Sequence, residues 1–307
     1  MNILLLGKGG QVGWELQRAL STLGAVTALG HDTPGPAACP HLRADFSQPE
    51  QVAALVRAVR PDVIVNAAAH TAVDKAESEP ELARALNATT PGLIAREAVR
   101  LGALLVHYST DYVFDGSGDQ PRNETAPTGP LSVYGQTKLQ GEQAIQASGC
   151  RHLIFRTSWV YAARGGNFAK TMLRLASERD QLKVIADQIG APTGADLLAD
   201  VTAHAIRTVQ SQPARVDLLG LYHLVASGHT HWHEYARFVI EWARKHGLPV
   251  RVAPDAVLPI TTAEYPMPAQ RPLNSRLDTA KVCQAFGLTL PPWQQGVERM
   301  LIEISGK

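Results

Sequence analysis

The chain has 307 residues, 45% of them hydrophobic and 19% charged, with a formal net charge of +1. This length accommodates a large α/β domain plus a smaller one, and the near-zero charge argues against nucleic acid or a membrane surface as partner. No apolar run approaches the roughly 20 residues of a transmembrane helix, the apolar start is too short for a signal peptide, and three scattered cysteines favour no disulfide framework, so we expect a cytoplasmic protein.

The first element is predicted to be a strand over residues 2–6, because the run is apolar without interruption once Asn2 is passed and fits burial on both faces. Gly7, Gly10 and Gly13 follow, and then apolar residues continue at helical spacing. The order is therefore strand, glycine turn, helix. Such a turn lets backbone N–H groups and a helix N-terminus approach a pyrophosphate. The alternative is a tight turn without a ligand.

A second strand is predicted over residues 25–29. Dinucleotide folds often place an acid after this strand to hold the adenosine ribose, but here Gly30 follows, so both NADPH and NADH stay open. Residues 31–40, rich in proline, are predicted to form a loop. Asp45 and Phe46 could lie near an adenine; alternatively, Asp45 and Ser47 form a turn that caps the helix expected over 48–59.

The next buried strand is expected over residues 62–66, followed by the small residues 67–69. The polar stretch 70–77 comes just outside this strand end, where ligands bind in open α/β sheets. His70 by itself fits a structural role as well as a functional one. One long helical pattern covers residues 79–100 and ends at Gly102.

A further strand over 103–108 leads into Ser109, Thr110 and Asp111, which fit either a ligand site or a capped turn. Ser132 is expected to begin a helix that carries Tyr134 and Lys138 on one face, one turn apart. A phenol beside an ammonium has a lowered pKa, which suits a proton donor near neutral pH. The same spacing also occurs on solvated helix faces, so the surrounding motifs decide between a catalytic pair and a solvated face. Glu142 is placed to pair with Lys138.

The second half of the chain alternates less regularly. A strand ends in residues 156–161, short strands are expected over 182–191 and 221–225, and helices over 168–179, 196–210, 231–246 and 292–304. We therefore predict a doubly wound Rossmann-type parallel sheet over residues 1–165. Residues 166–307 mainly form a smaller C-terminal substrate-binding lobe, with segments that can cross between the lobes.

Several stretches of the chain resemble one family closely. The glycine turn, Thr110 and Tyr134-x-x-x-Lys138 resemble the extended short-chain dehydrogenase/reductase superfamily. Longer runs resemble its dTDP-4-dehydrorhamnose reductase family, and the resemblance reaches from Met1 to about residue 300: Gly7–Gly13, Asn66–Asp74, Ser109–Gly116, Arg156–Tyr161 and Asp187–Thr193.

The resemblance implies an NAD(P)H-dependent reduction of the C4 ketone of dTDP-4-dehydro-6-deoxy-L-mannose to dTDP-L-rhamnose, the last step in making this activated sugar for surface polysaccharide. By the same resemblance, Tyr134 donates the proton, Lys138 lowers the pKa of Tyr134 and holds the nicotinamide ribose, and Thr110 hydrogen-bonds the same oxygen. Val73, Asp111 and Trp159 would contact the sugar. The cofactor site would comprise Gly7, Gly10, Gln11, Val12, Gly13, Asp45, Phe46, Ala69, His70, Thr71, Tyr108 and Lys138.

Some members of this family form homodimers through a magnesium ion held by acidic residues. Glu15 and Asp196 could supply part of such a site, but Pro291 and Pro292 stand where the family pattern has an acid. We therefore expect no metal to be required for the chemistry. Two alternative functions remain on the same scaffold: a nucleotide-sugar epimerase or dehydratase, and a non-catalytic regulatory subunit.

Overall fold

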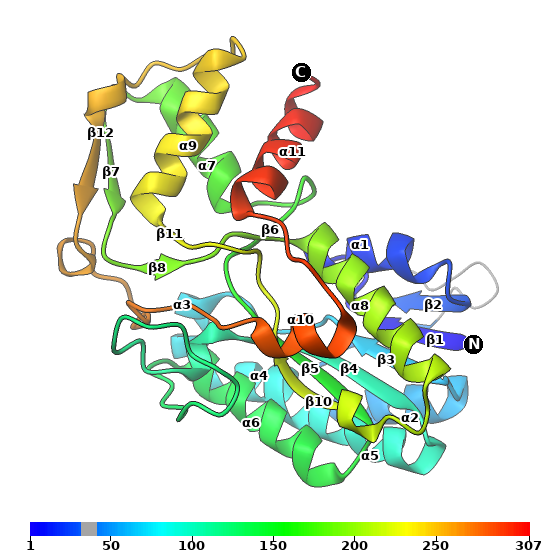
Figure 1. Ribbon diagram of the computed structural model, residues 1–307. Helices are drawn as coiled ribbons and strands as arrows, with labels where there is room; N and C mark the ends of the chain where they lie inside the picture. Colours follow the sequence, from blue (N-terminus) through cyan, green and yellow to red (C-terminus); the bar gives the residue numbers. More distant parts are fainter. Residues whose placement is uncertain (32–41) are drawn as a thin grey trace.

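A six-stranded sheet with only parallel pairs forms the centre of the larger lobe in the computed structural model, which describes residues 1–31 and 42–307 (Figure 1). The strand order is β10-β5-β4-β3-β1-β2, so the chain reverses direction across the sheet between β1 and β3. Open α/β sheets bind ligands at such a point, outside the carboxyl ends of the strands. The strands are β1 (Asn2–Leu6), β2 (Ala25–Leu29), β3 (Val63–Asn66), β4 (Leu104–Thr110), β5 (His152–Thr157) and β10 (Gly220–His223).

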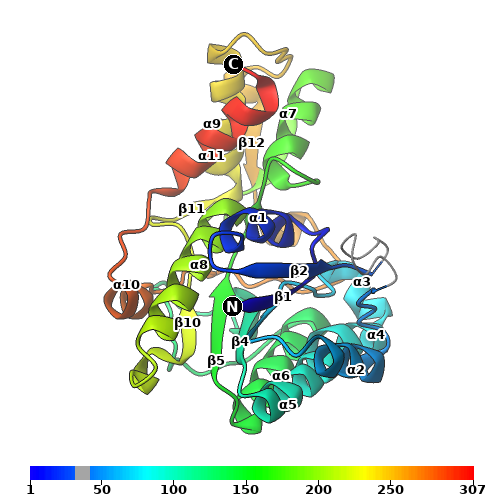
Figure 2. The same ribbon diagram turned by 90° about the vertical axis from the view of Figure 1, so that its right-hand side faces the viewer.

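Helices cover both faces of this sheet (Figures 1 and 2). One face packs against α1 (Gln11–Leu20), α8 (Ala195–Ser211) and α10 (Ala280–Phe286), and the other against α2 (Pro49–Val59), α5 (Thr90–Leu101) and α6 (Val133–Ser148). Consecutive residues of β1 enter opposite cores, Leu5 facing α1 and α8 and Leu4 facing α2 and α5. This double burial explains the uninterrupted apolar run, and the predicted doubly wound fold is confirmed.

The helical pattern predicted over 79–100 is broken in the structure. After α3 (Val73–Ser78) come α4 (Pro80–Arg84), a π-helical turn (Ala85–Thr89) and α5, which ends at Gly102 with φ +67°. Pro91 has no N–H to donate to the Asn87 carbonyl four residues earlier, which favours a wider turn here. Gly141 of α6 packs against this turn, since a Cβ at Gly141 would lie 2.1 Å from the Asn87 oxygen.

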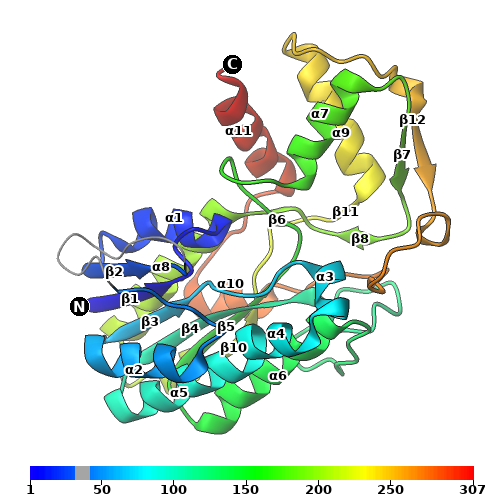
Figure 3. The same ribbon diagram turned by 180° about the vertical axis from the view of Figure 1, so that it is seen from behind.

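The smaller lobe has its own hydrophobic core (Figure 3). Its helices are α7 (Phe168–Glu178), α9 (Trp232–Lys245) and α11 (Trp293–Ser305), beside the parallel pair β7 (Leu182–Ile185) and β12 (Val257–Ile260). Two short pairs join the lobes: β6 (Val160–Tyr161) with β9 (Thr193–Gly194), and β8 (Ile189–Gly190) with β11 (Thr230–His231).

Segments from the second half of the chain cross into the larger lobe. The edge strand β10 pairs with β5, and α8 and α10 pack on the sheet, so the larger lobe extends well beyond residue 165. The loop predicted over 31–40 lies, apart from His31, outside the described residues. Within the described part of the chain, we find no helix with the length and apolarity needed to span a membrane.

Candidate active site

The glycine turn after β1 leaves backbone uncovered at the N-terminus of α1. Gly7 has φ +90°, and a Cβ there would lie 2.6 Å from the Ala68 nitrogen. A Cβ at Gly13 would lie 2.0 Å from the Gly7 oxygen, so these two positions require glycine. Gly10 occupies the N-cap position of α1 without a side-chain cap. The turn therefore fits an anionic pyrophosphate at the helix N-terminus.

Two further residues predicted for the cofactor lie at the start of α1. The side-chain amide of Gln11 lies 3.4 Å from the Gly166 carbonyl and links the turn to the second half of the chain. Val12 packs against the core below α1. Both residues adjoin the glycines of the turn. Their roles in binding the cofactor stay predictions.

Residues 45–47, ahead of α2, form a compact turn. The Ser47 hydroxyl and N–H donate to the Asp45 carboxylate at 2.7 and 2.9 Å, and the Ser47 hydroxyl bond lowers the pKa of Asp45. The predicted helix cap was wrong, because Gln48 takes the N-cap position of α2 without a side-chain hydrogen bond. Phe46 is buried in the core, and its carbonyl accepts from Thr90, so its ring does not lie free beside an open site.

The segment after β3 reaches the same sheet edge. Ala69 is half-buried and Thr71 is exposed, whereas His70 is buried. The His70 N–H donates to the Asn87 side chain at 2.8 Å, and its ring nitrogen lies 3.4 Å from Glu79. Asn87 also donates to Thr137 on α6 at 3.1 Å. This asparagine, which sequence reasoning missed, therefore ties the segment after β3 to the helix that carries Tyr134.

Thr110 and Tyr134 meet at the carboxyl end of β4. Ser132 caps α6 by accepting from the Gly135 N–H at 3.2 Å, and this fixes the first turn of the helix. The side chain of Thr110 lies beside the Tyr134 phenol. Thr110 also donates to Asp111 at 3.1 Å. The structure thus brings together the hydroxyl and the phenol that the sequence placed 24 positions apart.

The expected lowering of the Tyr134 pKa by Lys138 is wrong for the protein without cofactor. Burial raises the pKa of Tyr134 to about 12, the neighbouring Thr110 hydroxyl opposes this rise, and the Asp111 charge adds to it. The reason is that Lys138 is engaged elsewhere: its ammonium donates to the Tyr108 carbonyl at 2.5 Å. A proton therefore stays on Tyr134 until a substrate oxygen takes it.

The Lys138 side chain is almost completely buried. Burial lowers the pKa of Lys138 to about 8, although the Glu142 charge acts in the opposite direction. The Tyr108 phenol is bonded to Thr202 of α8 at 2.6 Å, and burial raises the pKa of that phenol. The Tyr108 ring thus lies in the core under the sheet, and only its carbonyl reaches Lys138.

Glu142 does not pair with Lys138 as predicted. It binds Arg156 of β5 instead, with the Arg156 Nε and Nη2 atoms 2.9 and 2.6 Å from the two carboxylate oxygens. A bidentate guanidinium–carboxylate pair satisfies two acceptors at once, which a lysine amine cannot do. The pair ties α6 to the sheet close to Lys138.

On the side of the smaller lobe, Trp159 has φ +49°, in the left-handed region that a tryptophan rarely adopts. Its ring stacks on Trp232 of α9, with centroids 3.6 Å apart and an interplanar angle of 15°. The Trp232 indole donates to the Gln188 side chain at 3.1 Å. Trp159 is therefore held by the second lobe, and Trp232 is a neighbour that sequence reasoning missed.

Asp111 and Val73 lie on the opposite side of this region. Asp111 is buried beside Thr110, and burial raises the pKa of its carboxyl to about 6, while hydrogen bonds from Ser275 and Thr110 oppose the rise. Val73 is the first residue of α3 and is half-buried. The next residue, Asp74, accepts from Arg271 at 2.7 and 3.0 Å.

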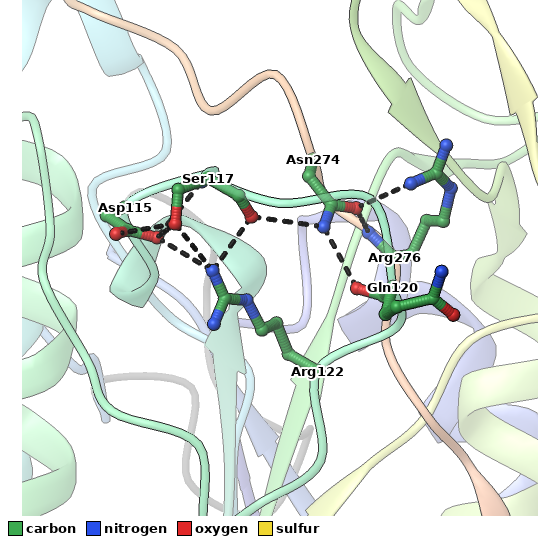
Figure 4. A network of polar contacts seen from close by, with 6 residues as sticks. All are labelled: Asp115, Ser117, Gln120, Arg122, Asn274 and Arg276. Carbon is green, nitrogen blue, oxygen red and sulfur yellow. Dashed lines mark hydrogen bonds and ion pairs between the residues drawn. The ribbon is translucent and has the colours of Figure 1, made fainter.

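The segment 271–278, called here the strap, fastens the loop that follows Asp111 (Figure 4). The Asn274 side-chain amide donates to the Gln120 carbonyl at 2.9 Å and lies 3.3 Å from the Ser117 carbonyl. Arg122 donates to Asp115 and Ser117 from the other side. The strap also pairs with β8 through Ile189, so it joins the small lobe to the loop beside Thr110. Its polar run of residues was visible in the sequence, but its partners were not.

The two acidic residues considered for magnesium line a cavity of about 480 Å³ between α1 and α11. Glu15 lies 3.4 Å from Arg18, and Asp196 lies 3.2 Å from Arg299. Within residues 1–31 and 42–307, no group of three histidine, cysteine, aspartate or glutamate side chains could hold a metal ion. Both carboxylates are paired with arginines, and we assign no step to a metal.

The parallel sheet with its glycine turn, and the Thr110–Tyr134–Lys138 group on β4 and α6, define an extended short-chain dehydrogenase/reductase. Residues 1–305 match the family model of the RmlD substrate binding domain. The chain belongs to this family, that of the dTDP-4-dehydrorhamnose reductases.

Individual relatives cover nearly the whole chain. A dTDP-4-dehydrorhamnose reductase of Escherichia coli K12 is 60% identical over 305 residues, covering 99% of this chain and 98% of that protein. One of Burkholderia thailandensis is 46% identical, covering 97% of each. The crystal structure of the Bacillus anthracis enzyme, in complex with NADP, is 32% identical with a TM-score of 0.83, covering 98% of this chain and 99% of that one.

Proposed function

We propose that this protein reduces the C4 ketone of dTDP-4-dehydro-6-deoxy-L-mannose with NAD(P)H and forms dTDP-L-rhamnose. The observation that carries the proposal is the position of Thr110 beside Tyr134, one helical turn from Lys138, at the edge of the sheet where the glycine turn also lies. Full-length similarity to reductases of this name supports the sugar substrate.

The reaction needs a hydride and a proton at one carbonyl group. Bound nicotinamide supplies the hydride to C4. Tyr134 donates its proton to the C4 oxygen as negative charge develops there, and Thr110 donates a hydrogen bond to the same oxygen. Lys138 holds the nicotinamide ribose, which brings its positive charge towards Tyr134 and stabilises the phenolate left after proton transfer.

The glycine turn is proposed to accept the cofactor pyrophosphate, since Gly7 and Gly13 allow the close backbone packing of this turn, where any Cβ would collide with neighbouring backbone atoms. Gly30 follows β2, so no carboxylate at this position repels a 2′-phosphate. We therefore propose that NADPH and NADH both serve as hydride donors. The NADP in the Bacillus anthracis structure supports this choice for NADPH.

The decisive experiment supplies the 4-keto sugar nucleotide with NADPH and NADH separately and follows the absorbance of the reduced nicotinamide. Stoichiometric oxidation is expected, which distinguishes the reductase from an epimerase or dehydratase that regenerates its cofactor. Tyr134→Phe is expected to bind the cofactor normally but lose about 10²- to 10⁴-fold in turnover. Near wild-type turnover of this variant would refute the role of Tyr134. Absence of any turnover by the wild-type protein would favour a regulatory subunit.

A further inference from the structure

A buried chain of polar side chains ends at Lys138. It comprises Asn66 at the end of β3, His107 on β4 and Lys138 itself, which are only 1%, 1% and 2% exposed. The Asn66 Nδ2 atom lies 3.1 Å from His107 Nδ1, and His107 Nε2 lies 3.4 Å from Lys138 Nζ. The proposed mechanism uses Lys138 but assigns nothing to the other two.

A backbone N–H group fixes the direction of the hydrogen bonds along these side chains. The Ala68 N–H can only donate, and it points at the Asn66 Oδ1 atom from 3.1 Å. The Asn66 amide must therefore present its NH₂ group to His107 Nδ1, which has to accept. A neutral imidazole that accepts at Nδ1 carries its proton on Nε2. The reversed amide would set two donors against each other at 3.1 Å.

This tautomer of His107 places an N–H donor beside Lys138. The His107 Nε2–H bond points at Nζ, and an ammonium has three donors and no acceptor, whereas an amine has a lone pair that can accept. His107 stays neutral, because its pKa is held well below its usual range. The main cause is burial, and the Lys138 charge is the smaller one.

We propose that His107 is a positioning residue for catalysis: its Nε2–H, oriented by Asn66, weakens the hold of the Lys138 ammonium on its proton. The buried lysine is then ready to give up its proton when the Tyr134 phenolate needs one. The inference deepens the proposed function, on which its catalytic meaning rests, while the hydrogen-bond geometry stands independently of the substrate.

No other group around α6 replaces this control in the described part of the chain. Glu142 on the same helix is bound to Arg156 of β5. The remaining titratable neighbours are Glu77 of α3, which accepts from the Val133 N–H, Glu79 before α4, which pairs with Lys75, Asp111, which contacts Thr110, and the phenols of Tyr108 and Tyr134. Of these residues, only Tyr108 contacts Nζ, through its backbone carbonyl.

The first test is the tautomer of His107 in the wild-type protein, read from the ¹⁵N chemical shifts of labelled histidine, with His107→Gln used for assignment. We expect a pyridine-type Nδ1 and a protonated Nε2 that stay neutral down to acidic pH. A protonated Nδ1 would overturn the proposal. This measurement needs neither substrate nor an altered protein in the decisive sample.

The second test follows Lys138 with ¹³Cε-labelled lysine, assigned by its missing resonance in Lys138→Arg. In His107→Gln, the amide oxygen can face Nζ and accept from the ammonium, so the titration midpoint of Lys138 should rise by on the order of one pH unit, a tenfold change in the ionisation equilibrium. The alkaline limb of the turnover–pH profile should move with it. His204→Gln is the control, since this ring on α8 contacts the Phe286 carbonyl at the end of α10.

An unchanged Lys138 midpoint in folded His107→Gln would also overturn the proposal. Both NMR measurements are made on the protein without sugar. If the wild-type protein failed to reduce the 4-keto sugar, the proposed function would fail, and the His107 tautomer and the Lys138 midpoint would still decide this inference separately.

Discussion

Arg156 of β5 holds Glu142 of α6 through two hydrogen bonds of 2.9 and 2.6 Å, and the two side chains are only 4% and 1% exposed. Arg156 also lies over the Phe114 ring, 5.0 Å from its centroid. The pair joins the sheet to the helix that carries Tyr134 and Lys138. Removing one partner leaves the other charge buried without compensation.

Glu142→Gln is therefore expected to lower the free energy of unfolding by about 3 to 5 kcal/mol. Urea denaturation of the variant and the wild-type protein measures this difference. The matched control is Glu178→Gln, which removes the carboxylate from an exposed pair with Arg174 and should change stability by less than about 0.5 kcal/mol. Equal losses of stability in both variants would contradict the claim that the buried pair stabilises the protein more than the exposed pair does.

Gly13→Ala is expected to disrupt the nucleotide turn, because the added Cβ would lie 2.0 Å from the Gly7 oxygen. Cofactor affinity should fall by at least about tenfold, or about 1.4 kcal/mol of binding free energy. Gly9→Ala is the control, since a Cβ there meets nothing within 4 Å. Titration of intrinsic fluorescence with NADPH compares the three proteins, and tight binding by Gly13→Ala would contradict the assignment of the turn.

Asp111 should make stability depend on pH in an unusual direction. Its carboxyl has a raised pKa of about 6, so the folded state holds this proton more tightly than the unfolded chain does. The stabilisation is complete below pH of about 4 and is lost as the pH rises through about 6. At pH 7 the buried carboxylate costs roughly 2 to 3 kcal/mol.

Asp111→Asn removes this titration. The variant should gain stability relative to wild type between pH 4 and 7 in parallel urea denaturation series, and it should lose activity if Asp111 contacts the sugar. A constant stability difference across this pH range would show that Asp111 is already ionised in the folded protein at pH 4.

Asn274→Ala is expected to release the strap from the loop that follows Asp111, because both loop carbonyls lose the amide donor. We expect a stability loss of about 1 to 3 kcal/mol and a fall in turnover with cofactor affinity preserved. Gln120→Ala is a sharp control, since the strap uses only the backbone carbonyl of Gln120 (Figure 4). If both variants behaved alike, the side chain of Asn274 would not be the fastening element.

Local patterns in the sequence predicted the larger lobe well. Burial on both faces makes β1 apolar after Asn2 and β4 apolar over its first three residues, and Ser132 marks the start of α6, so Tyr134 and Lys138 could be placed on one helix face. The elements that were missed are short: β11 has two residues and α10 has seven, too few for a periodic pattern.

Long-range partners could not be predicted in the same way. Glu142 was expected to bind Lys138, four residues away, but a bidentate arginine from β5 takes it. Trp232 lies far from Trp159 in the chain, and only the fold of the smaller lobe stacks their rings. His107 reads as an ordinary strand residue until the Asn66 amide is seen to orient it.

The edge strand β10 has a consequence for synthesis of the protein on the ribosome. β5 ends at Thr157, but its outer neighbour is complete only at His223. At translation speeds of about 5 to 20 residues per second, β5 waits roughly 3 to 13 s with one side unpaired. An apolar strand in this state can pair with other chains. The nascent protein therefore needs shielding during this interval, and a fragment that ends near residue 165 should aggregate rather than fold.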